Sequence, residues 1–140
     1  MPDVLVASDA EWVYQEVLQV LRGPDLAVRW VRSGPDAVAA VTERTPDLAV
    51  LDLQIGNMGA MAISLELHLE EGMGRLPHVP ILILLDRRPD VFLARRSGAE
   101  GFVVKPLDPI RLRKAVTALL AGGTYEDDSY KPMTVSPTGV

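Results

Sequence analysis

Short aliphatic runs alternate with longer helical patterns along this chain, and this alternation constrains its fold more than any other feature. Such a pattern is typical of parallel strands that are covered by helices on both faces of a sheet. Residues 79–85 form the strongest candidate, an aliphatic run that suits a strand buried on both faces. The other predicted strands are 4–7, 26–31, 48–53 and 101–104. The pattern therefore predicts five β-α units in a doubly wound α/β domain.

Capping residues mark the last helix and the end of the domain. Asp108 can cap this helix, Pro109 fits its first position, and a pair of glycines ends it. Its inward-facing residues are predicted to be Leu112, Ala115, Val116, Leu119 and Leu120. The segment that follows is polar and shows no apolar periodicity. We therefore expect one folded domain over residues 1–121 and a flexible polar tail over residues 122–140.

The composition excludes several classes of protein. Because cysteine is absent, disulfide frameworks, thiolate metal sites and cysteine nucleophiles are excluded. The formal net charge of −5 argues against direct DNA binding, which needs a dense basic face. No apolar run approaches the roughly 20 residues of a membrane helix, and the N-terminus lacks the basic leader of a secretory signal. We therefore expect a cytoplasmic protein that does not contact a membrane.

Polar residues follow three of the predicted strands at the point where each strand ends. Ser8 and Asp9 follow the first strand, Asp52 closes the third, and Lys105 and Pro106 follow the fifth. Because the carboxyl ends of parallel strands meet at one edge of a sheet, these groups are expected to lie close together. Two carboxylates in one site need a compensating cation. Lys105 supplies one positive charge, and Mg²⁺, which prefers oxygen ligands, could supply the rest.

Two acids beside an ammonium group are what phosphoryl transfer to a carboxylate requires. The acceptor carboxylate must lie in line with the donor phosphorus, and the cations must offset charge on the transferred oxygens. Asp52 is the candidate acceptor, and Lys105 is the candidate phosphate-binding group. Structural roles for the same residues stay open. Ser8 and Glu11 fit a helix capping box, Asp52 could be a turn or cap residue, and Lys105 could simply neutralise the acids.

Four segments of the chain resemble the response regulator receiver domain of two-component signalling: VLVASDA, PDLAVLDLQ, VPILILL and GAEGFVVKPLDP. The resemblance covers roughly residues 3–121. It implies a flavodoxin-like (βα)5 fold, in which a five-stranded parallel sheet has the strand order 2-1-3-4-5.

The resemblance also implies a role for each residue at the strand ends. Asp52 matches the phosphorylated aspartate, and Lys105 matches the family's lysine beside it. Asp9 matches the acid that ligates Mg²⁺, which would also be held by Asp52 and by the backbone carbonyl of Gln54. Pro106 matches the proline whose peptide bond is usually cis in the family.

Two residues depart from the family pattern at functional positions. Ser8 stands where receivers usually carry another acid, so one water-mediated metal contact is lost and Mg²⁺ affinity should fall. Leu85 stands where a Thr or Ser hydroxyl binds the phosphoryl group and draws the aromatic switch residue inward. That aromatic residue is Phe102 here. Leucine cannot donate a hydrogen bond, so the departures question the phosphorylation-driven switch more than the fold.

The preferred functional hypothesis is an atypical, stand-alone receiver in a phosphorelay, which is not itself an enzyme. It would take its phosphoryl group from a histidine kinase or phosphotransfer protein and would signal by docking a downstream protein partner. By resemblance, the docking face is formed by the fourth helix, the fifth strand and the fifth helix, and a homodimer through it is compatible with this reading. The residues of this face are Phe92, Arg95, Arg96, Phe102 and Arg111.

The alternative hypothesis is a phosphorylation-independent pseudo-receiver that acts as a protein-interaction or dimerisation module. The departures at Ser8 and Leu85 favour it. An enzyme on the same fold has little support, because the sequence shows no general base, no redox cofactor site and no activated nucleophile other than Asp52.

Overall fold

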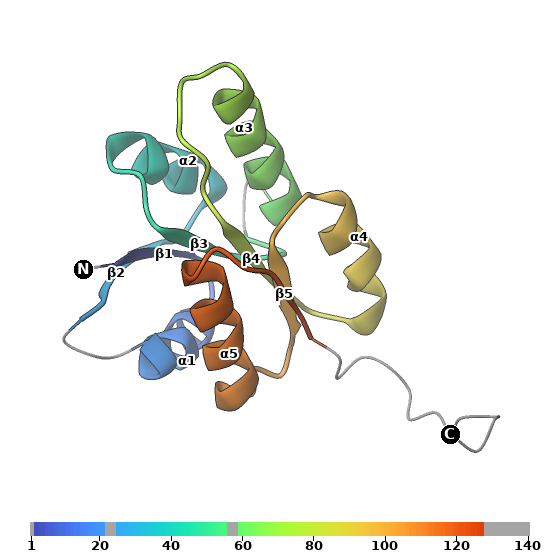
Figure 1. Cartoon of the computed structure of the whole chain (residues 1–140). Coiled ribbons are helices and arrows are strands. Elements are labelled where there is room, and N and C mark those ends of the chain that lie inside the picture. The colour runs from blue at the N-terminus through green and yellow to red at the C-terminus, as the bar shows by residue number, and fades with distance from the viewer. Residues whose placement is uncertain (1, 22–24, 56–58, 128–140) are drawn as a thin grey trace.

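The computed structural model describes residues 2–21, 25–55 and 59–127. Within them, parallel strands form one sheet in the order β2-β1-β3-β4-β5-β6 (Figure 1). The strands are β1 Asp3–Ala7, β2 Ala27–Val31, β3 Leu48–Asp52, β4 Ile81–Leu85, β5 Gly101–Val104 and β6 Tyr125–Glu126. The helices are α1 Glu11–Leu21, α2 Gly34–Glu43, α3 Ala60–Gly72, α4 Val91–Arg96 and α5 Pro109–Leu120. The predicted doubly wound fold and its strand order 2-1-3-4-5 are confirmed, with one short strand added beyond β5.

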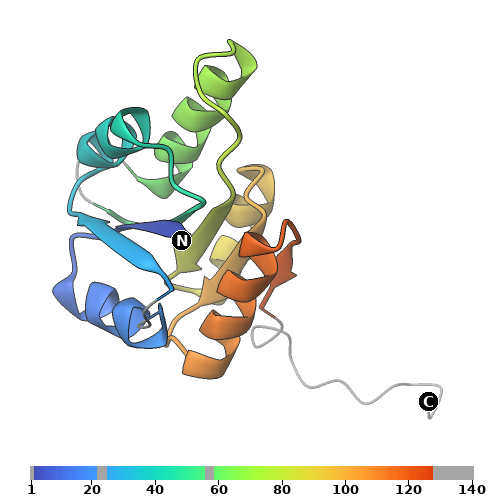
Figure 2. The same cartoon turned by 60° about the vertical axis from the view of Figure 1, so that its left-hand side comes forward.

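Helices cover both faces of the sheet. Figures 1 and 2 show α1 and α5 on one face, and α2, α3 and α4 on the other. Val13 of α1 and Leu112 of α5 belong to one buried apolar cluster. Ala37 of α2, Ile63 of α3 and Ala94 of α4 belong to a second cluster. The sheet therefore separates two apolar layers, which is the arrangement that aliphatic strands flanked by amphipathic helices predict.

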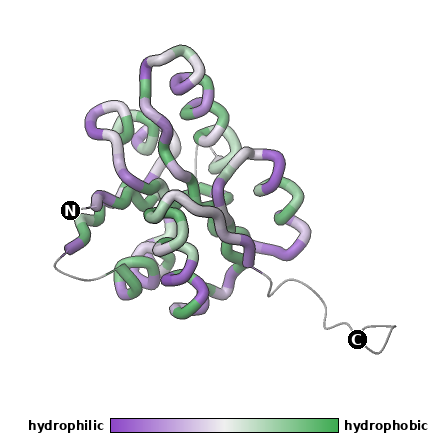
Figure 3. Tube along the Cα trace, viewed as in Figure 1, coloured by the Kyte–Doolittle hydropathy of each residue, from purple (hydrophilic) through white to green (hydrophobic). Residues whose placement is uncertain are grey.

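Strand β4 lies in the middle of this arrangement and explains the strongest signal in the sequence. Its five residues are completely buried. Ile81, Ile83 and Leu85 face one apolar cluster, and Leu82 and Leu84 face the other. Figure 3 shows the strands as the hydrophobic centre of the molecule, with hydrophilic segments toward the outside. Burial of one such side chain contributes about 1.5–3 kcal/mol. β4 therefore stabilises the neighbouring strands β3 and β5, whose ends carry the candidate site residues.

Side-chain caps begin α2 and α5, and the cap of α5 was predicted from the sequence. The Ser33 side chain accepts a hydrogen bond from the Asp36 N–H at 3.2 Å at the start of α2. Asp108 caps α5 by accepting from the Ile110 N–H at 3.0 Å. The predicted inward-facing residues of α5 are buried except Leu120, which is partly exposed: Leu112, Ala115, Val116 and Leu119.

The structure differs from the sequence prediction at the C-terminal end of the fold. The two residues of β6 pair with β5 in parallel, within the segment that was expected to be a polar tail. The sheet can accept them because Gly101 has no side chain, and a Cβ there would lie 2.8 Å from the Tyr125 carbonyl oxygen. Asp127 follows as a completely buried residue, and its Oδ2 accepts a hydrogen bond from the Val104 N–H at 2.9 Å. Residues 128–140 lie outside the described residues.

The start of β4 differs from the predicted strand, and the helix that follows β4 is short. β4 begins at Ile81, after the proline of the aliphatic run. α4 is only six residues long and is preceded by a 3-10 turn, Arg88–Asp90. The Asp90 carboxylate stabilises this turn by accepting from the Arg87 N–H at 3.0 Å. In the described part of the chain, no helix has the length and apolar character that crossing a membrane requires.

Candidate functional site

The polar groups that follow β1, β3 and β5 meet at the carboxyl edge of the sheet. Asp52 is the last residue of β3, and its two carboxylate oxygens have different partners. The Lys105 Nζ lies 2.7 Å from Asp52 Oδ1. The Ser8 hydroxyl donates a hydrogen bond to Asp52 Oδ2 at 2.8 Å. Three segments that are far apart in the sequence therefore converge on one carboxylate.

Burial makes this cluster electrostatically strong. Only 4% of Asp52 is exposed, Ser8 is completely buried, and the Lys105 side chain is 11% exposed. An ion pair that water reaches poorly is screened much less than a surface pair, and hydrogen bonds between charged groups are about twice as strong as neutral ones. The Asp52 carboxylate is therefore fixed in place by two donors on different strands.

Asp86 is a member of the site that the sequence analysis did not identify. Its Oδ1 lies 2.8 Å from Lys105 Nζ, so one ammonium group bridges two carboxylates. The pairing of Leu85 with Val104 places the residues that follow β4 and β5 side by side. The only signal in the sequence was an acid directly after the strongest strand, which in isolation resembles an ordinary loop residue.

The two carboxylates determine the protonation of Lys105. Burial by itself lowers the pKa of the Lys105 ammonium, because a charged group loses solvation. The hydrogen bonds that Lys105 donates to Asp52 and Asp86, together with the negative charges of these carboxylates, outweigh burial and raise this pKa above its ordinary value. Lys105 is therefore fully cationic at neutral pH.

Ser8 has a different role from the predicted capping box. Its hydroxyl oxygen accepts a hydrogen bond from the Ala10 N–H at 3.1 Å, and its proton is directed at Asp52 Oδ2. Helix α1 begins at Glu11. Ser8 thus organises the turn between β1 and α1, and at the same time holds the candidate acceptor where receivers usually place another acid.

Trp12 covers the opposite side of the Lys105 ammonium. The Nζ atom lies 5.6 Å from the centre of the Trp12 ring, within the range of a cation–π contact. The Trp12 side chain is 54% exposed. The sequence analysis did not connect Trp12 with the site, because its contact depends on how the first turn of α1 lies relative to the residue that follows β5.

The remaining candidate metal ligands lie at the same edge. Asp9 follows Ser8 and is exposed, as is Gln54, two residues after Asp52. Within residues 2–21, 25–55 and 59–127, no three His, Asp or Glu side chains form a ready metal-binding group. The donors are nevertheless hard oxygens, and the carboxylates of Asp9, Asp52 and Asp86 exceed the single charge of Lys105. The site therefore suits a cation such as Mg²⁺ bound by few protein ligands and by water.

The switch-related residues belong to two paired strands: Leu85 ends β4, and Phe102 lies in β5. Leu85 is completely buried, and Phe102 is 3% exposed in the same apolar cluster. Both side chains are packed inward. The Lys105-Pro106 peptide bond is cis, as the resemblance implied for Pro106.

The face expected to dock partners is partly covered by the chain itself. β6 lies along β5, and Glu126 accepts from the Arg95 guanidinium at 2.8 Å. The Arg111 guanidinium approaches the Asp127 carboxylate at 3.8 Å. Phe92 remains 69% exposed on α4, and Arg96 is exposed as well, whereas Phe102 is buried. The structure thus leaves the α4 side of this face open and covers the β5 edge.

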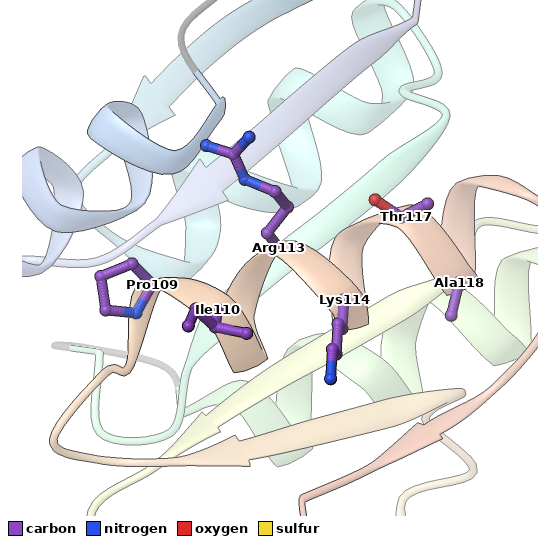
Figure 4. A pocket seen from close by; sticks show the side chains of 6 residues that line it. All are labelled: Pro109, Ile110, Arg113, Lys114, Thr117 and Ala118. Atoms are coloured by element: carbon purple, nitrogen blue, oxygen red, sulfur yellow. The ribbon is translucent and has the colours of Figure 1, made fainter.

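Two surface hollows accompany these elements. One, of about 720 Å³, lies along α5 and is separate from the strand-end site; Figure 4 shows its lining residues. They are Pro109, Ile110, Arg113, Lys114, Thr117 and Ala118. The other, of about 360 Å³, adjoins the site itself. Its lining includes Lys105, Asp86 and the side chains of Arg87, Arg88 and Arg111, which makes it predominantly basic.

Comparisons with known proteins agree with this fold. The family model of the response regulator receiver domain matches residues 4–117. The DNA-binding response regulator MtrA of Mycolicibacterium smegmatis is 33% identical over 119 residues, which cover 84% of this chain and 50% of that protein. An uncharacterized response regulatory protein of Mycobacterium tuberculosis is 34% identical over 132 residues, which cover 86% of this chain and 96% of that protein. The chain thus spans about half the length of MtrA.

Solved structures show the same architecture. The signal receiver domain of a signal transduction histidine kinase from Syntrophus aciditrophicus aligns with a TM-score of 0.76 and 25% identity. The alignment covers 87% of this chain and 92% of that chain. A response regulator from Chloroflexus aurantiacus aligns with a TM-score of 0.77 and 24% identity over 86% of this chain and 98% of that chain, a likeness that concerns the fold.

Proposed function

This chain belongs to the response regulator receiver family of two-component signalling, and we propose that it accepts a phosphoryl group on Asp52. The observation that supports this most directly is the buried Asp52 carboxylate, held between the Ser8 hydroxyl and the Lys105 ammonium. Such a carboxylate is fixed in one orientation, which lowers the entropic cost of in-line attack on phosphorus. The ammonium lies where it can offset charge on the transferred oxygens.

The proposed reaction is a displacement at phosphorus. An Asp52 carboxylate oxygen forms the new P–O bond while the P–N bond of a phosphohistidine donor breaks. The histidine nitrogen keeps the electron pair of the broken bond. With acetyl phosphate as donor, a P–O bond breaks instead and acetate leaves. In both cases the product on this chain is an aspartyl phosphate, and no oxidant or reductant takes part.

Receiver domains generally bind Mg²⁺ at this acidic pocket. We propose that Asp9, Asp52 and the Gln54 carbonyl would hold the ion here, with the Ser8 hydroxyl leaving the site weaker than one with a second acid. When bound, Mg²⁺ supplies positive charge that stabilises the transferred oxygens. Ser8 contributes by orienting Asp52 Oδ2, and Lys105 by binding an oxygen of the phosphoryl group.

The partners follow from this role. Receiver domains interact with histidine kinases and phosphotransfer proteins and are generally signalling modules, not enzymes. Response regulators are usually cytoplasmic, which suits such partners. We propose that this chain signals by docking a downstream protein through the α4 side of its face, where Phe92 is exposed. The net charge of −5 favours a protein partner over direct contact with DNA.

Phosphorylation can be tested by intact mass. The purified chain is incubated with Mg²⁺ and acetyl phosphate, and the mass of one phosphoryl group should be added to the wild type. Asp52→Asn is the matched control, because it preserves shape but removes the nucleophile, and it should gain no mass. A chelator added before the donor should prevent labelling of the wild type. If the wild type remains unlabelled with acetyl phosphate and with histidine-based donors, the proposal is wrong.

A phosphorylation-independent module is the second candidate, and two observations favour it. Leu85 offers no hydroxyl to a phosphoryl group, and Phe102 is already buried at 3% exposure. In receivers the aromatic side chain usually turns inward on phosphorylation. Because Phe102 is already buried, phosphorylation would not turn it further inward. Under this proposal, Asp52→Asn and Asp52→Glu leave partner binding or dimerisation unchanged. A change of either property on substitution would contradict it.

A further inference from the structure

The Lys105 ammonium is shared between the candidate acceptor and a second carboxylate. It lies 2.7 Å from Asp52 Oδ1 and 2.8 Å from Asp86 Oδ1. An ammonium has three N–H donors, so these two contacts occupy most of its capacity. A phosphoryl group on Asp52 would need the same donors. Any group that holds Lys105 in its present position therefore competes with the phosphoryl group.

The negative charge of Asp86 also opposes a phosphoryl group on Asp52. Transfer of a phosphoryl group adds negative charge to Asp52, close to the Asp86 carboxylate that the same ammonium contacts. The Asp86 side chain is 31% exposed and Asp52 is 4% exposed, so repulsion between these charges is only partly screened by water. With a phosphoryl group on Asp52, the single charge of Lys105 would face both that group and Asp86, so the product state is destabilised relative to a site without Asp86.

Asp86 is also poorly satisfied where it lies. Its Oδ2 atom is buried and has no hydrogen-bond partner among the described residues. The basic hollow of about 360 Å³ beside it is lined by Arg87 and Arg88. The Arg88 side chain is exposed at the rim of this region. Arg87 pairs with Asp90 at 3.4 Å, so the exposed Arg88 is the cationic side chain of this hollow toward which the Asp86 carboxylate could turn.

We propose that Asp86 is a positioning residue that restrains Lys105 and thereby limits phosphoryl occupancy of Asp52. This inference rests on the proposed function, because it concerns the same acceptor. It assigns to the residue after Leu85 a specific effect: Asp86 occupies an N–H donor of the ammonium that the incoming group would need, and thereby raises the barrier to phosphorylation. The contact is released when the carboxylate turns toward Arg88.

The experiment separates the effect of the charge at position 86 from the effect of the side chain's shape. Wild type, Asp86→Asn, Asp86→Glu and Asp86→Ser are incubated with Mg²⁺ and acetyl phosphate, and the initial rate of mass gain is measured. Removing one nearby charge from a partly buried site should raise the rate about tenfold in Asp86→Asn. Asp86→Ser should behave in the same way, whereas Asp86→Glu, which keeps the carboxylate, should remain within about threefold of wild type. Thermal unfolding of each variant verifies that it is folded.

A binding measurement separates this role from a merely structural one. Beryllofluoride, a phosphoryl mimic, is titrated into each protein with Mg²⁺, and the fluorescence of Trp12 reports on the ammonium beneath it. Trp12→Phe identifies the part of the signal that comes from Trp30. Asp86→Asn should bind beryllofluoride about tenfold more tightly than wild type, and Asp86→Glu should not.

The outcomes distinguish the two proposals. Faster labelling and tighter binding in Asp86→Asn and Asp86→Ser, but not in Asp86→Glu, support the restraint. Labelling of all four proteins at equal rates overturns it and leaves phosphorylation of Asp52 intact. Slower labelling in Asp86→Asn overturns it as well, because Asp86 would then assist transfer. If no protein is labelled, including the neutral variants, the proposed function fails and the restraint fails with it.

Discussion

The two ends of the sheet carry the same arrangement, one cationic side chain between two carboxylates. At the carboxyl end, Lys105 Nζ bridges Asp52 and Asp86 at 2.7 and 2.8 Å. At the amino end, His78 lies between a residue of α3 and the residue before β5. Its Nδ1 is 2.7 Å from Glu71 Oε1, and its Nε2 is 2.6 Å from Glu100 Oε1. The Lys105 side chain is 11% exposed and that of His78 is 47% exposed.

Burial and the nature of the cation give the two ends different properties. The pKa of Lys105 is raised from an already alkaline value, so this ammonium keeps its charge at every physiological pH. The pKa of His78 is also raised, mainly by its hydrogen bond with Glu71, against the opposing effect of burial. An ordinary histidine titrates near pH 6.5, and because the pKa of His78 is raised, this side chain loses its proton at a higher pH than that. The buried end suits charge-dependent chemistry, and the exposed end suits a weak, pH-dependent contact.

The largest expected effect comes from removing the buried cation. Lys105→Met leaves Asp52 nearly buried without its counter-charge, and loss of one partner of a buried pair costs about 3 kcal/mol. Urea unfolding at pH 8 should show this loss. Lys114→Met on the exposed side of α5 is the control, and its free energy of unfolding should change by about 0.5 kcal/mol or less. A loss of similar size in both variants would remove the contrast between buried and exposed cations.

The pH dependence of this effect has a definite sign. A cation whose folded-state pKa is raised contributes its full stabilisation below the unfolded-state pKa, about 10.4 for lysine. The contribution is lost as the pH rises through the folded-state value. The difference between wild type and Lys105→Met should therefore stay constant at neutral pH and shrink only under strongly alkaline conditions. An appreciable decrease between pH 7 and pH 9 would contradict the raised pKa.

The next effect concerns the backbone that carries Lys105. Asp127 is completely buried and accepts from the Val104 N–H, directly before Lys105. Asp127→Ala leaves that N–H buried without an acceptor, which should cost about 2 kcal/mol in urea unfolding. Glu126→Ala is the control, because Glu126 makes an exposed pair with Arg95 and should cost about 0.5 kcal/mol. Equal losses would mean that Asp127 does not hold the end of β5.

The sequence predicted the parts of the site that depend on strand order. Asp52 and Lys105 were identified because both follow aliphatic strands, and parallel strands bring their carboxyl ends together. Asp86 was missed because its contact depends on register: Leu85 pairs with Val104, and only this pairing sets Asp86 beside Lys105. Strand order can be inferred from a pattern of residues, whereas register within a sheet requires the packed structure.

The C-terminal strand was missed for a related reason. Two residues, Tyr125 and Glu126, are too short a strand to show any periodicity, and the acids around them resemble a solvated tail. Their placement depends on the missing side chain at Gly101 and on the buried hydrogen bond of Asp127. Both are tertiary contacts. The local sequence therefore showed only that these residues are polar, and not that they pair with β5.

A smaller effect is expected when a carboxylate is added to the buried end. Ser8→Asp replaces the hydroxyl that donates to Asp52 Oδ2 with a like charge. Without Mg²⁺ the free energy of unfolding should fall by about 1 kcal/mol through repulsion with Asp52. Mg²⁺ should restore it, and isothermal titration should show tighter Mg²⁺ binding than in wild type. Ser8→Ala controls for the lost hydrogen bond, since it should lose stability without gaining affinity.

The smallest effect belongs to the exposed end and depends on pH. Because the folded-state pKa of His78 is raised, its stabilisation is present below about pH 6.5 and is lost as the pH rises through the folded-state value. His78→Gln should therefore lower the free energy of unfolding by about 0.5 kcal/mol at pH 6 and leave it unchanged at pH 9, as expected for an exposed pair. Urea unfolding at both pH values measures this, and the same substitution in a Glu71→Gln background should have a smaller effect at pH 6. A loss that is equal at both pH values would mean that His78 stabilises the fold through packing. The comparison with Lys105, which stabilises the fold through its charge, would then no longer hold.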